Sequence, residues 1–289
     1  MYGLLMKNSY ASYRILLVHA HPDDETINNG ATMALYAARG AQVTLVTCTR
    51  GEEGEVLVPG LSHLASSNDD ALGAHRELEL AAAMKALGIK DHRFLGHFRD
   101  SGMMGTEANN RADTFWLADL DSAAQLLVDI IEEVKPHILI TYDEIGGYGH
   151  PDHIKAHLVA MRASELSQWQ IQKIYWNTMP KSVIAAGIAA MKAIGSDFFG
   201  TDNVEDIPFA KDDSFVTTLI DGNEFVESKM AAMKAHETQI ALDGPFFALS
   251  NNLGLQIWGH EYYTLVKGLK TAPFDGEGRE SDLTSGILL

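Results

Sequence analysis

A continuous apolar run, RILLVHA at residues 14–20, does most to restrict the folds open to this chain. Apolar side chains at successive positions predict a strand buried on both faces, as in a parallel sheet that helices cover. A helical pattern follows at 26–39, Gly40 is its expected end, and a second apolar run occupies 41–49. Strand, helix and strand joined by short links predict a βαβ unit and therefore an α/β fold.

The alternation of apolar runs and helical patterns continues well beyond this unit. Further strands are expected at 93–96, 137–142 and 173–179, and further helices at 69–87, 117–134 and 154–164. The segments 50–68 and 98–111 are expected to be long loops, which in compact domains are usually functional. This order predicts a Rossmann-like three-layer α/β/α sandwich with a mostly parallel sheet.

The rhythm of the pattern changes after Pro180. Helices are expected at 182–194 and 223–240 and a strand at 215–220, whereas 250–260 shows a mixed pattern. We expect one domain over residues 1–289. Its parts are a Rossmann-like core at 14–180, a C-terminal extension at 181–270 that covers the site, and a loosely held tail at 271–289 that is rich in glycine and charge.

The charge and cysteine content exclude several classes of partner. The formal net charge is −17, whereas nucleic acids and anionic membranes bind clustered lysine and arginine. The single cysteine, Cys48, cannot form an internal disulfide and is expected to be a small core residue. No signal peptide is recognised at 1–13, and no run approaches the roughly 18 apolar residues that span a bilayer. We expect a cytoplasmic protein, and the oligomeric state is left open.

Two clusters of histidines and carboxylates each follow a predicted strand and precede a predicted helix. The first is HAHPDDE at 19–25, and the second is HPDH at 150–153. Proline and aspartate are common in turns, so either cluster alone would be ordinary turn chemistry. Open α/β sheets, however, bind ligands at the carboxyl ends of their strands, where both clusters are expected. Their shared placement predicts that the two clusters meet around one metal ion.

His21, Asp24 and His153 are the expected metal ligands. Zinc binds imidazole nitrogen and carboxylate oxygen, and a catalytic zinc site leaves one position open for water. A metal bound there would lower the pKa of water toward ~7 and would polarise a carbonyl group. The same ligands also suit Fe(II), so Fe²⁺ is the alternative to Zn²⁺.

The remaining side chains of the two clusters suit proton transfer, stabilisation of an oxyanion and orientation of an imidazole ring. Asp23 is the spare carboxylate and would act as a general base. His150 would stabilise an oxyanion or donate a proton, and Asp152 would hydrogen-bond an imidazole and fix its tautomer. Glu25 is expected to be an acid at a helix N-terminus that the helix dipole stabilises.

His19 and His157 are expected to have structural positions only. His19 lies within the first predicted strand and is expected to be buried there. His157 is expected on a helix surface. Neither residue is assigned a role in the site.

The two clusters together resemble the zinc-dependent de-N-acetylases of the PIG-L/LmbE family. HPDDE at 21–25 and HPDH at 150–153 carry this resemblance. Four further segments are similar to the mycothiol-biosynthesis branch of the family: GEEGE at 51–55, RDSGM at 99–103, GGYG at 146–149 and ALSNNL at 248–253. The resemblance extends over residues 14–266. An enzyme of that branch removes acetate from N-acetylglucosaminyl-inositol.

The resemblance implies the same zinc ligands, His21, Asp24 and His153, that the residue types predict. It also implies the same general base, Asp23. It implies that His150 stabilises the charged intermediate and that Asp152 orients His150. Tyr148 would polarise the amide carbonyl or contact the intermediate. Further side chains are implied to bind the substrate: Arg76 and Asp100 at the sugar hydroxyls, with Glu53, His236 and Gln239 as additional candidates. Without the family, Arg76 would be an ordinary arginine on a helix surface.

The leading hypothesis is therefore zinc-dependent hydrolysis of the N-acetyl group of an amino-sugar glycoside, 1-D-myo-inositol 2-acetamido-2-deoxy-α-D-glucopyranoside, in mycothiol biosynthesis. The alternatives of the same chemistry are a mycothiol S-conjugate amidase and another amino-sugar de-N-acetylase. An alternative of another class is a Rossmann nucleotide-binding module without catalysis. No Gly-x-Gly-x-x-Gly motif follows the first predicted strand, and the carboxylates at 23–25 would repel a pyrophosphate.

Overall fold

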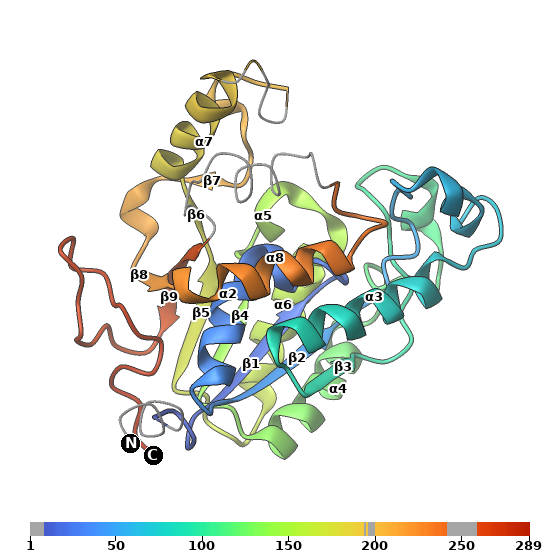
Figure 1. Ribbon diagram of the computed structural model, residues 1–289. Coiled ribbons are helices and arrows are strands. Elements are labelled where there is room, and N and C mark those ends of the chain that lie inside the picture. Colours follow the sequence, from blue (N-terminus) through green and yellow to red (C-terminus); the bar gives the residue numbers. More distant parts are fainter. Residues whose placement is uncertain (1–8, 194, 196–199, 242–258) are drawn as a thin grey trace.

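The computed structural model describes residues 9–193, 195, 200–241 and 259–289. These residues build a seven-stranded sheet with the order β3-β2-β1-β4-β5-β9-β8, and helices lie against both of its faces (Figure 1). The strands are β1 (Arg14–His19), β2 (Gln42–Thr47), β3 (Asp91–Phe94), β4 (Ile138–Thr141), β5 (Lys173–Asn177), β8 (Thr218–Asp221) and β9 (His260–Lys267). The predicted α/β sandwich is confirmed.

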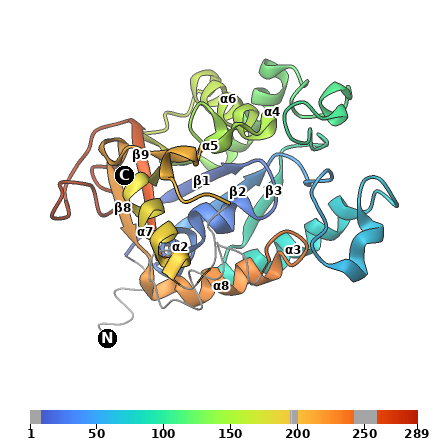
Figure 2. The same cartoon turned by 90° about the horizontal axis from the view of Figure 1, so that it is seen from above.

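The helices form two layers with the sheet between them (Figure 2). One layer contains α2 (Asp24–Ala38), α3 (Leu72–Leu87) and α8 (Val226–Ala235), and the other contains α4 (Leu120–Val134) and α6 (Pro151–Leu166). Short 3₁₀ helices occupy Pro59–Leu64, Glu107–Asn110, Val204–Asp206, Asp213–Phe215 and Asn223–Phe225. None of the helices in the described ranges is both long and apolar enough to cross a membrane.

Strand β1 contributes to an apolar core on each side of the sheet. Ile15 and Leu17 belong to one core, and Leu16 and Val18 belong to the other. This division arises because successive side chains of a strand point to opposite faces. It explains why the strand is an unbroken apolar run rather than an alternating one.

The central five strands follow the predicted parallel arrangement. Strands β1 to β5 run parallel, whereas β9 is antiparallel to both β5 and β8. Strand β9 is not predicted from the sequence: it begins in the mixed pattern at 250–260, and only Glu261 and Tyr263 of its residues are buried. Both β8 and β9 come from the expected C-terminal extension, and they lengthen the central sheet rather than only packing on it.

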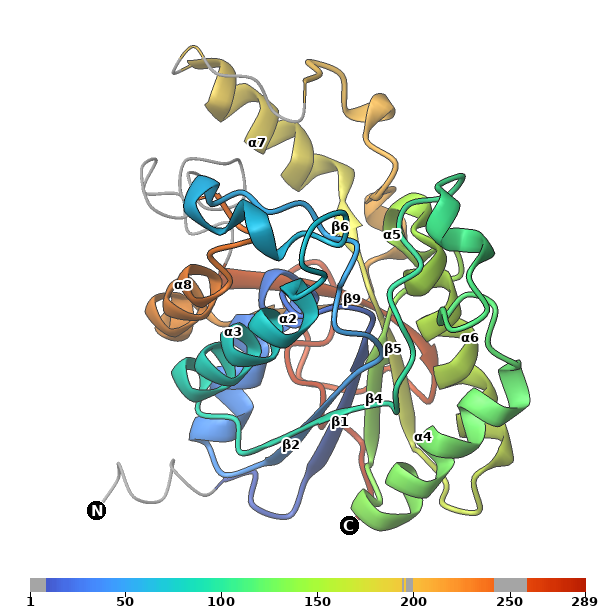
Figure 3. The ribbon, with the colours of Figure 1, turned by 90° about the vertical axis from the view of Figure 1, so that its right-hand side faces the viewer.

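The remainder of the extension includes a small lobe. The lobe contains β6 (Met179–Pro180), α7 (Lys181–Ala193) and β7 (Ala210–Lys211), and β6 pairs in parallel with β7. Apolar side chains of α7 pack with Ile207 into a separate cluster. Figure 3 shows α7 beyond the carboxyl ends of the central strands.

The expectation of a loosely held tail at 271–289 is wrong. Leu283 and Glu280 are fully buried, and the backbone of Glu280 pairs with Thr217 and Leu219 along the open edge of the sheet. The Glu280 carboxylate also accepts a hydrogen bond from Lys173 Nζ at 2.6 Å. One charged residue of this segment, Glu280, therefore belongs to a buried ion pair, and composition alone does not distinguish such a residue from one in a solvated tail.

Candidate metal centre and active site

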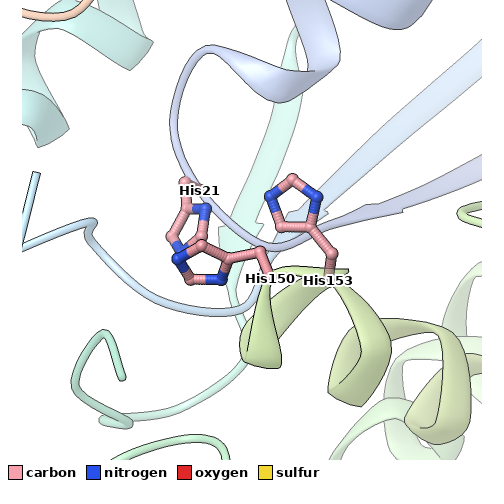
Figure 4. Close-up of side chains that lie close together, drawn as sticks. All are labelled: His21, His150 and His153. Atoms are coloured by element: carbon pink, nitrogen blue, oxygen red, sulfur yellow. The ribbon is translucent and has the colours of Figure 1, made fainter. Parts of the chain in front are cut away.

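The two clusters meet at the carboxyl ends of β1 and β4, which are neighbours in the sheet. His21 lies on the loop between β1 and α2, and His150 and His153 lie at the start of α6 (Figure 4). One nitrogen of each imidazole lies within 4.8 Å of the others. The predicted meeting of the clusters is therefore seen in the structure.

Asp24 lies between two of these histidines. Its Oδ2 is 3.5 Å from His21 Nδ1 and 3.4 Å from His153 Nε2. His153 Nδ1 lies 3.2 Å from the Gly146 carbonyl oxygen and must donate to it, which leaves Nε2 of the neutral ring as an acceptor. Within the described residues, this buried Nε2 has no hydrogen-bond partner. Two acceptors therefore face each other without a proton between them.

This arrangement fits a bound cation. Burial lowers the pKa of His153 to about 4 against the opposing effect of Asp24, so the ring is neutral at pH 7. Burial would raise the pKa of Asp24, but His153 and His21 hold it well below its usual range. Two ligands that are each about 2.1 Å from a tetrahedral ion lie about 3.4 Å apart. The nitrogen and oxygen donors suit zinc or Fe(II).

The start of α6 fixes His150 and Asp152. Pro151 occupies the first helical position, and His150 Nδ1 caps the helix by accepting a hydrogen bond from the Asp152 N–H at 3.1 Å. The Asp152 carboxylate accepts a hydrogen bond from the Ser101 N–H at 2.8 Å and lies 3.3 Å from His21 Nε2. In the structure, this carboxylate therefore faces His21, whereas the expectation placed it on His150.

Asp23 has the backbone and the environment of a functional residue. Its φ of 111° lies in a region that L-residues rarely adopt. Its Oδ2 lies 3.3 Å from Arg76 Nη2. Burial raises the pKa of Asp23 to about 7, with Arg76 opposing and Asp24 adding to the shift. A carboxylate with this pKa is suited to accept a proton near neutral pH.

Arg76 is 3% exposed, so the helix-surface interpretation of this residue is wrong. Its Nη1 donates to the Gly51 carbonyl oxygen at 2.8 Å, and its Nη2 donates to the Pro22 carbonyl oxygen. A Cβ on Gly51 would lie 2.0 Å from Nη1, so only glycine allows this approach. Arg76 thereby fastens the first cluster to the loop at 50–68, and its predicted contact with sugar hydroxyls stays a prediction.

Asp100 lies beside the metal centre, whereas the Glu53 side chain is engaged elsewhere. Asp100 Oδ1 is 3.5 Å from His21 Nε2 and accepts a hydrogen bond from the Gly102 N–H at 2.8 Å. Burial alone would lower the pKa of His21, but Asp100 and the other carboxylates around it raise that pKa well above its usual value. The Glu53 carboxylate pairs with Arg99 at 2.7 Å.

Tyr148 borders the same site from the glycine-rich turn α5 (Gly146–Gly149). Its ring centroid is 4.9 Å from that of His153, and 44% of the residue is exposed. Burial and the nearby carboxylates raise its pKa above the usual value, so the phenol keeps its proton. Gly146 has a φ of +63°, and a Cβ there would lie 2.6 Å from the His153 Cβ. The turn therefore needs glycine to bring Tyr148 next to His153.

Residues from the C-terminal part of the chain contact the first cluster and the loop at 50–68. Glu25 lies in the first turn of α2, as expected, but it is fully buried and lies 2.9 Å from His236 Nε2. Its other oxygen accepts a hydrogen bond from the Asp23 N–H at 3.0 Å. Gln239 donates to the Glu55 carbonyl oxygen at 2.9 Å. The matching segment at 248–253 lies outside the described residues.

His19, His157 and Tyr142 lie in or next to the two clusters. His19 is fully buried, as expected. His157 is only 7% exposed and donates from Nδ1 to the Tyr142 carbonyl oxygen at 3.0 Å, so its expected place on a helix surface is wrong. Sequence reasoning missed Tyr142, whose hydroxyl donates to Asp24 Oδ2 at 2.7 Å. Its place at the end of a predicted strand, shortly before the second cluster, is the signal that could have found it.

Comparison with known proteins places these features in a family. The family model described as GlcNAc-PI de-N-acetylase, PIG-L, matches residues 16–164, which include both clusters. The chain is 55% identical to 1D-myo-inositol 2-acetamido-2-deoxy-alpha-D-glucopyranoside deacetylase 1 of Catenulispora acidiphila, over 96% of this chain and 90% of that protein. It is 56% identical to the deacetylase of the same description from Acidothermus cellulolyticus, over 94% of each chain.

Two solved structures are similar to this one in fold. N,N'-diacetylchitobiose deacetylase from Pyrococcus horikoshii has a TM-score of 0.56 at 19% identity, over 88% of this chain and 84% of that chain. The 4-carboxy-2-hydroxymuconate hydratase of Pseudomonas putida has a TM-score of 0.60 at 18% identity, over 91% and 100%. These matches concern the fold alone, because one fold hosts different reactions. The family match and the curated relatives show that the chain belongs to the GlcNAc-PI de-N-acetylase (PIG-L) family.

Proposed function

We propose that this protein is a zinc-dependent deacetylase of 1-D-myo-inositol 2-acetamido-2-deoxy-α-D-glucopyranoside in mycothiol biosynthesis, with glucosaminyl-inositol and acetate as products. The observation that carries the proposal is the unpartnered His153 Nε2, which faces the ionised Asp24 at 3.4 Å beside His21. The substrate is taken from the names of relatives that align over nearly the whole chain.

His21, Asp24 and His153 would hold the metal. The ion, when bound, supplies Lewis acidity to water and to the amide carbonyl. Zinc is proposed because the family resemblance implies it, and Fe²⁺ stays the alternative because it accepts the same ligands.

Asp23 is the proposed general base. It takes a proton from the attacking water as the water oxygen bonds to the acetamide carbon. When the C–N bond breaks, that proton passes to the sugar nitrogen, and the amine leaves together with acetic acid. The acid then gives its remaining proton to the amine or to solvent and becomes acetate. A pKa of about 7 for Asp23 allows both halves of this transfer near neutral pH.

His150 and Tyr148 are the proposed stabilisers of the oxyanion. Because His150 Nδ1 accepts the Asp152 N–H, the neutral ring carries its proton on Nε2 and can donate from there. Burial and the two neighbouring histidines lower the pKa of His150 to about 3, which keeps the ring neutral at pH 7. Tyr148 adds a phenol that stays protonated. Donors aimed at the developing charge are the usual source of such stabilisation.

The sugar is proposed to lie against Asp100 and Arg76. Asp100 is the better placed of the two, because it lies 3.5 Å from His21 and is itself held by backbone N–H groups. Arg76 would act mainly through the Asp23 loop that it fastens. Glu53 would act through Arg99, with which it pairs.

A panel of amides tests the substrate. We expect acetate release from N-acetylglucosaminyl-inositol to exceed release from N,N'-diacetylchitobiose by at least tenfold in kcat/KM. Cleavage of a bimane S-conjugate of mycothiol should be slower by a similar factor, because its acyl group is larger. Rates would be measured on the purified protein by quantifying acetate and free amine. A higher kcat/KM on the conjugate would instead identify an S-conjugate amidase, and a tight dinucleotide complex without hydrolysis would contradict both assignments.

A further inference from the structure

Tyr142 contacts two of the proposed metal ligands at once. It directly follows β4 and is 4% exposed. Its hydroxyl donates to Asp24 Oδ2 at 2.7 Å, and its ring stacks on the His153 ring with a centroid distance of 4.4 Å and an interplanar angle of 23°. The one side chain therefore restrains both the carboxylate and the imidazole that would share the ion.

The direction of the Tyr142 hydroxyl is fixed by groups behind it. The Ala20 N–H donates to the hydroxyl oxygen at 2.9 Å, and His19 Nδ1 lies 3.2 Å from it. The single hydroxyl proton can thus reach the Asp24 carboxylate or His19 Nδ1. The contact with Asp24 is shorter and involves a charged acceptor, which makes it the stronger of the two. The proton is therefore directed at Asp24.

His19 is held in turn by a buried hydrogen-bond network. Its Nε2 lies 2.7 Å from Asn29 Oδ1, and the Asn29 amide nitrogen donates to Asn177 Oδ1 at 2.8 Å and to the Tyr263 hydroxyl at 3.0 Å. His19 and Asn29 are fully buried. The network joins β1, α2, β5 and β9, so a strand from the C-terminal part of the chain is linked to the surroundings of the metal centre.

We propose that Tyr142 is a positioning residue for the metal centre. His19 holds it in place through its ring, which packs edge-on against the Tyr142 ring with a centroid distance of 5.3 Å, and Asn29 fixes His19. The inference rests on the proposed function, because it requires a metal at His21, Asp24 and His153. A hydroxyl that fixes the orientation of a ligating carboxylate before the ion arrives reduces the ordering that binding must supply. Loss of such a supporting contact typically lowers metal affinity by about 10–100-fold.

The variant Tyr142→Phe tests this inference, because it removes the hydroxyl and keeps the ring that stacks on His153. Tyr175→Phe is the matched control: Tyr175 is fully buried, and its hydroxyl donates to Glu280 Oε2 at 2.9 Å, away from the metal centre. Zinc affinity would be measured by competition with a chromogenic chelator, and ligand geometry by the visible spectrum of the Co²⁺ form. We expect Tyr142→Phe to bind zinc about 10–100-fold more weakly with an altered Co²⁺ spectrum, and the control to stay within about twofold.

The outcomes separate this inference from the proposed function. If the wild-type protein binds neither zinc nor Co²⁺, both fail together. If the wild type binds metal and releases acetate while Tyr142→Phe matches it in affinity and spectrum, only this inference is overturned. Asn29→Ala is the second variant, for use if Tyr142→Phe does not fold. It frees His19 and should weaken zinc binding by about threefold or more, and an unchanged affinity would overturn the inference.

Discussion

Replacing Asp23 by asparagine is expected to lower kcat for N-acetylglucosaminyl-inositol by about 10²–10⁴-fold while the protein keeps its zinc. Asparagine has nearly the same size and shape but cannot take a proton from water. The Asp23 carboxylate lies against Arg76, whereas the proposed ligands lie around Asp24, so the ion should not be lost. Acetate release and metal content would be measured on the same preparation.

Asp129→Asn is the control, because it makes the same replacement at an exposed residue of α4. It should leave the rate of acetate release and the zinc content unchanged. An Asp23→Asn variant with wild-type turnover would contradict the assignment of the base. A variant that has lost both its zinc and its activity would place Asp23 among the ligands instead.

Replacing the adjacent Asp24 by asparagine is expected to have the opposite signature, with the metal lost first and activity lost as a consequence. Asp24 supplies the anionic donor between His21 and His153. Without its charge, two neutral imidazoles would hold the ion alone, and we expect less than one tenth of the wild-type zinc content after dialysis. Metal analysis before and after dialysis measures this loss directly.

Addition of excess zinc provides a further check on Asp24→Asn. If Asp24 is a ligand, added zinc should restore little activity, because the remaining donors bind the ion weakly and in a different geometry. A dialysed Asp24→Asn protein that keeps one zinc ion per chain would contradict the ligand set. The two adjacent aspartates therefore give separable results in one experiment.

The central fold could be predicted because its signals are local. Strand β1 is buried on both faces and reads as an unbroken apolar run, and Gly88 ends α3 in the left-handed conformation at a φ of 75°. Strand β9 and the tail could not be predicted in this way. The residues of β9 are buried on one face only, and Glu280 is buried through partners that lie far away in sequence.

In the site, too, residues in local sequence motifs could be predicted, whereas residues whose place depends on tertiary packing could not. His21, Asp24 and His153 could be named because each cluster follows a strand and carries residue types that bind metals. Tyr142 and the burial of His157 depend on which helix packs over which strand, and spacing along the chain does not reveal this packing. Arg76 illustrates the limit: the family resemblance pointed to it, but only the structure shows that it holds the backbone of Pro22 and Gly51.

Acetate release during the return of zinc to the metal-free protein shows directly whether hydrolysis depends on the bound metal. The protein would be freed of metal with a chelator, dialysed, and titrated with Zn²⁺, and in parallel with Fe²⁺ under anaerobic conditions, while hydrolysis of N-acetylglucosaminyl-inositol is followed. We expect the metal-free protein to be inactive and the rate to rise in proportion to added metal until one ion per chain is bound. Full activity in the metal-free protein, or no acetate release at any metal content, would rule out the proposed metal-dependent deacetylation.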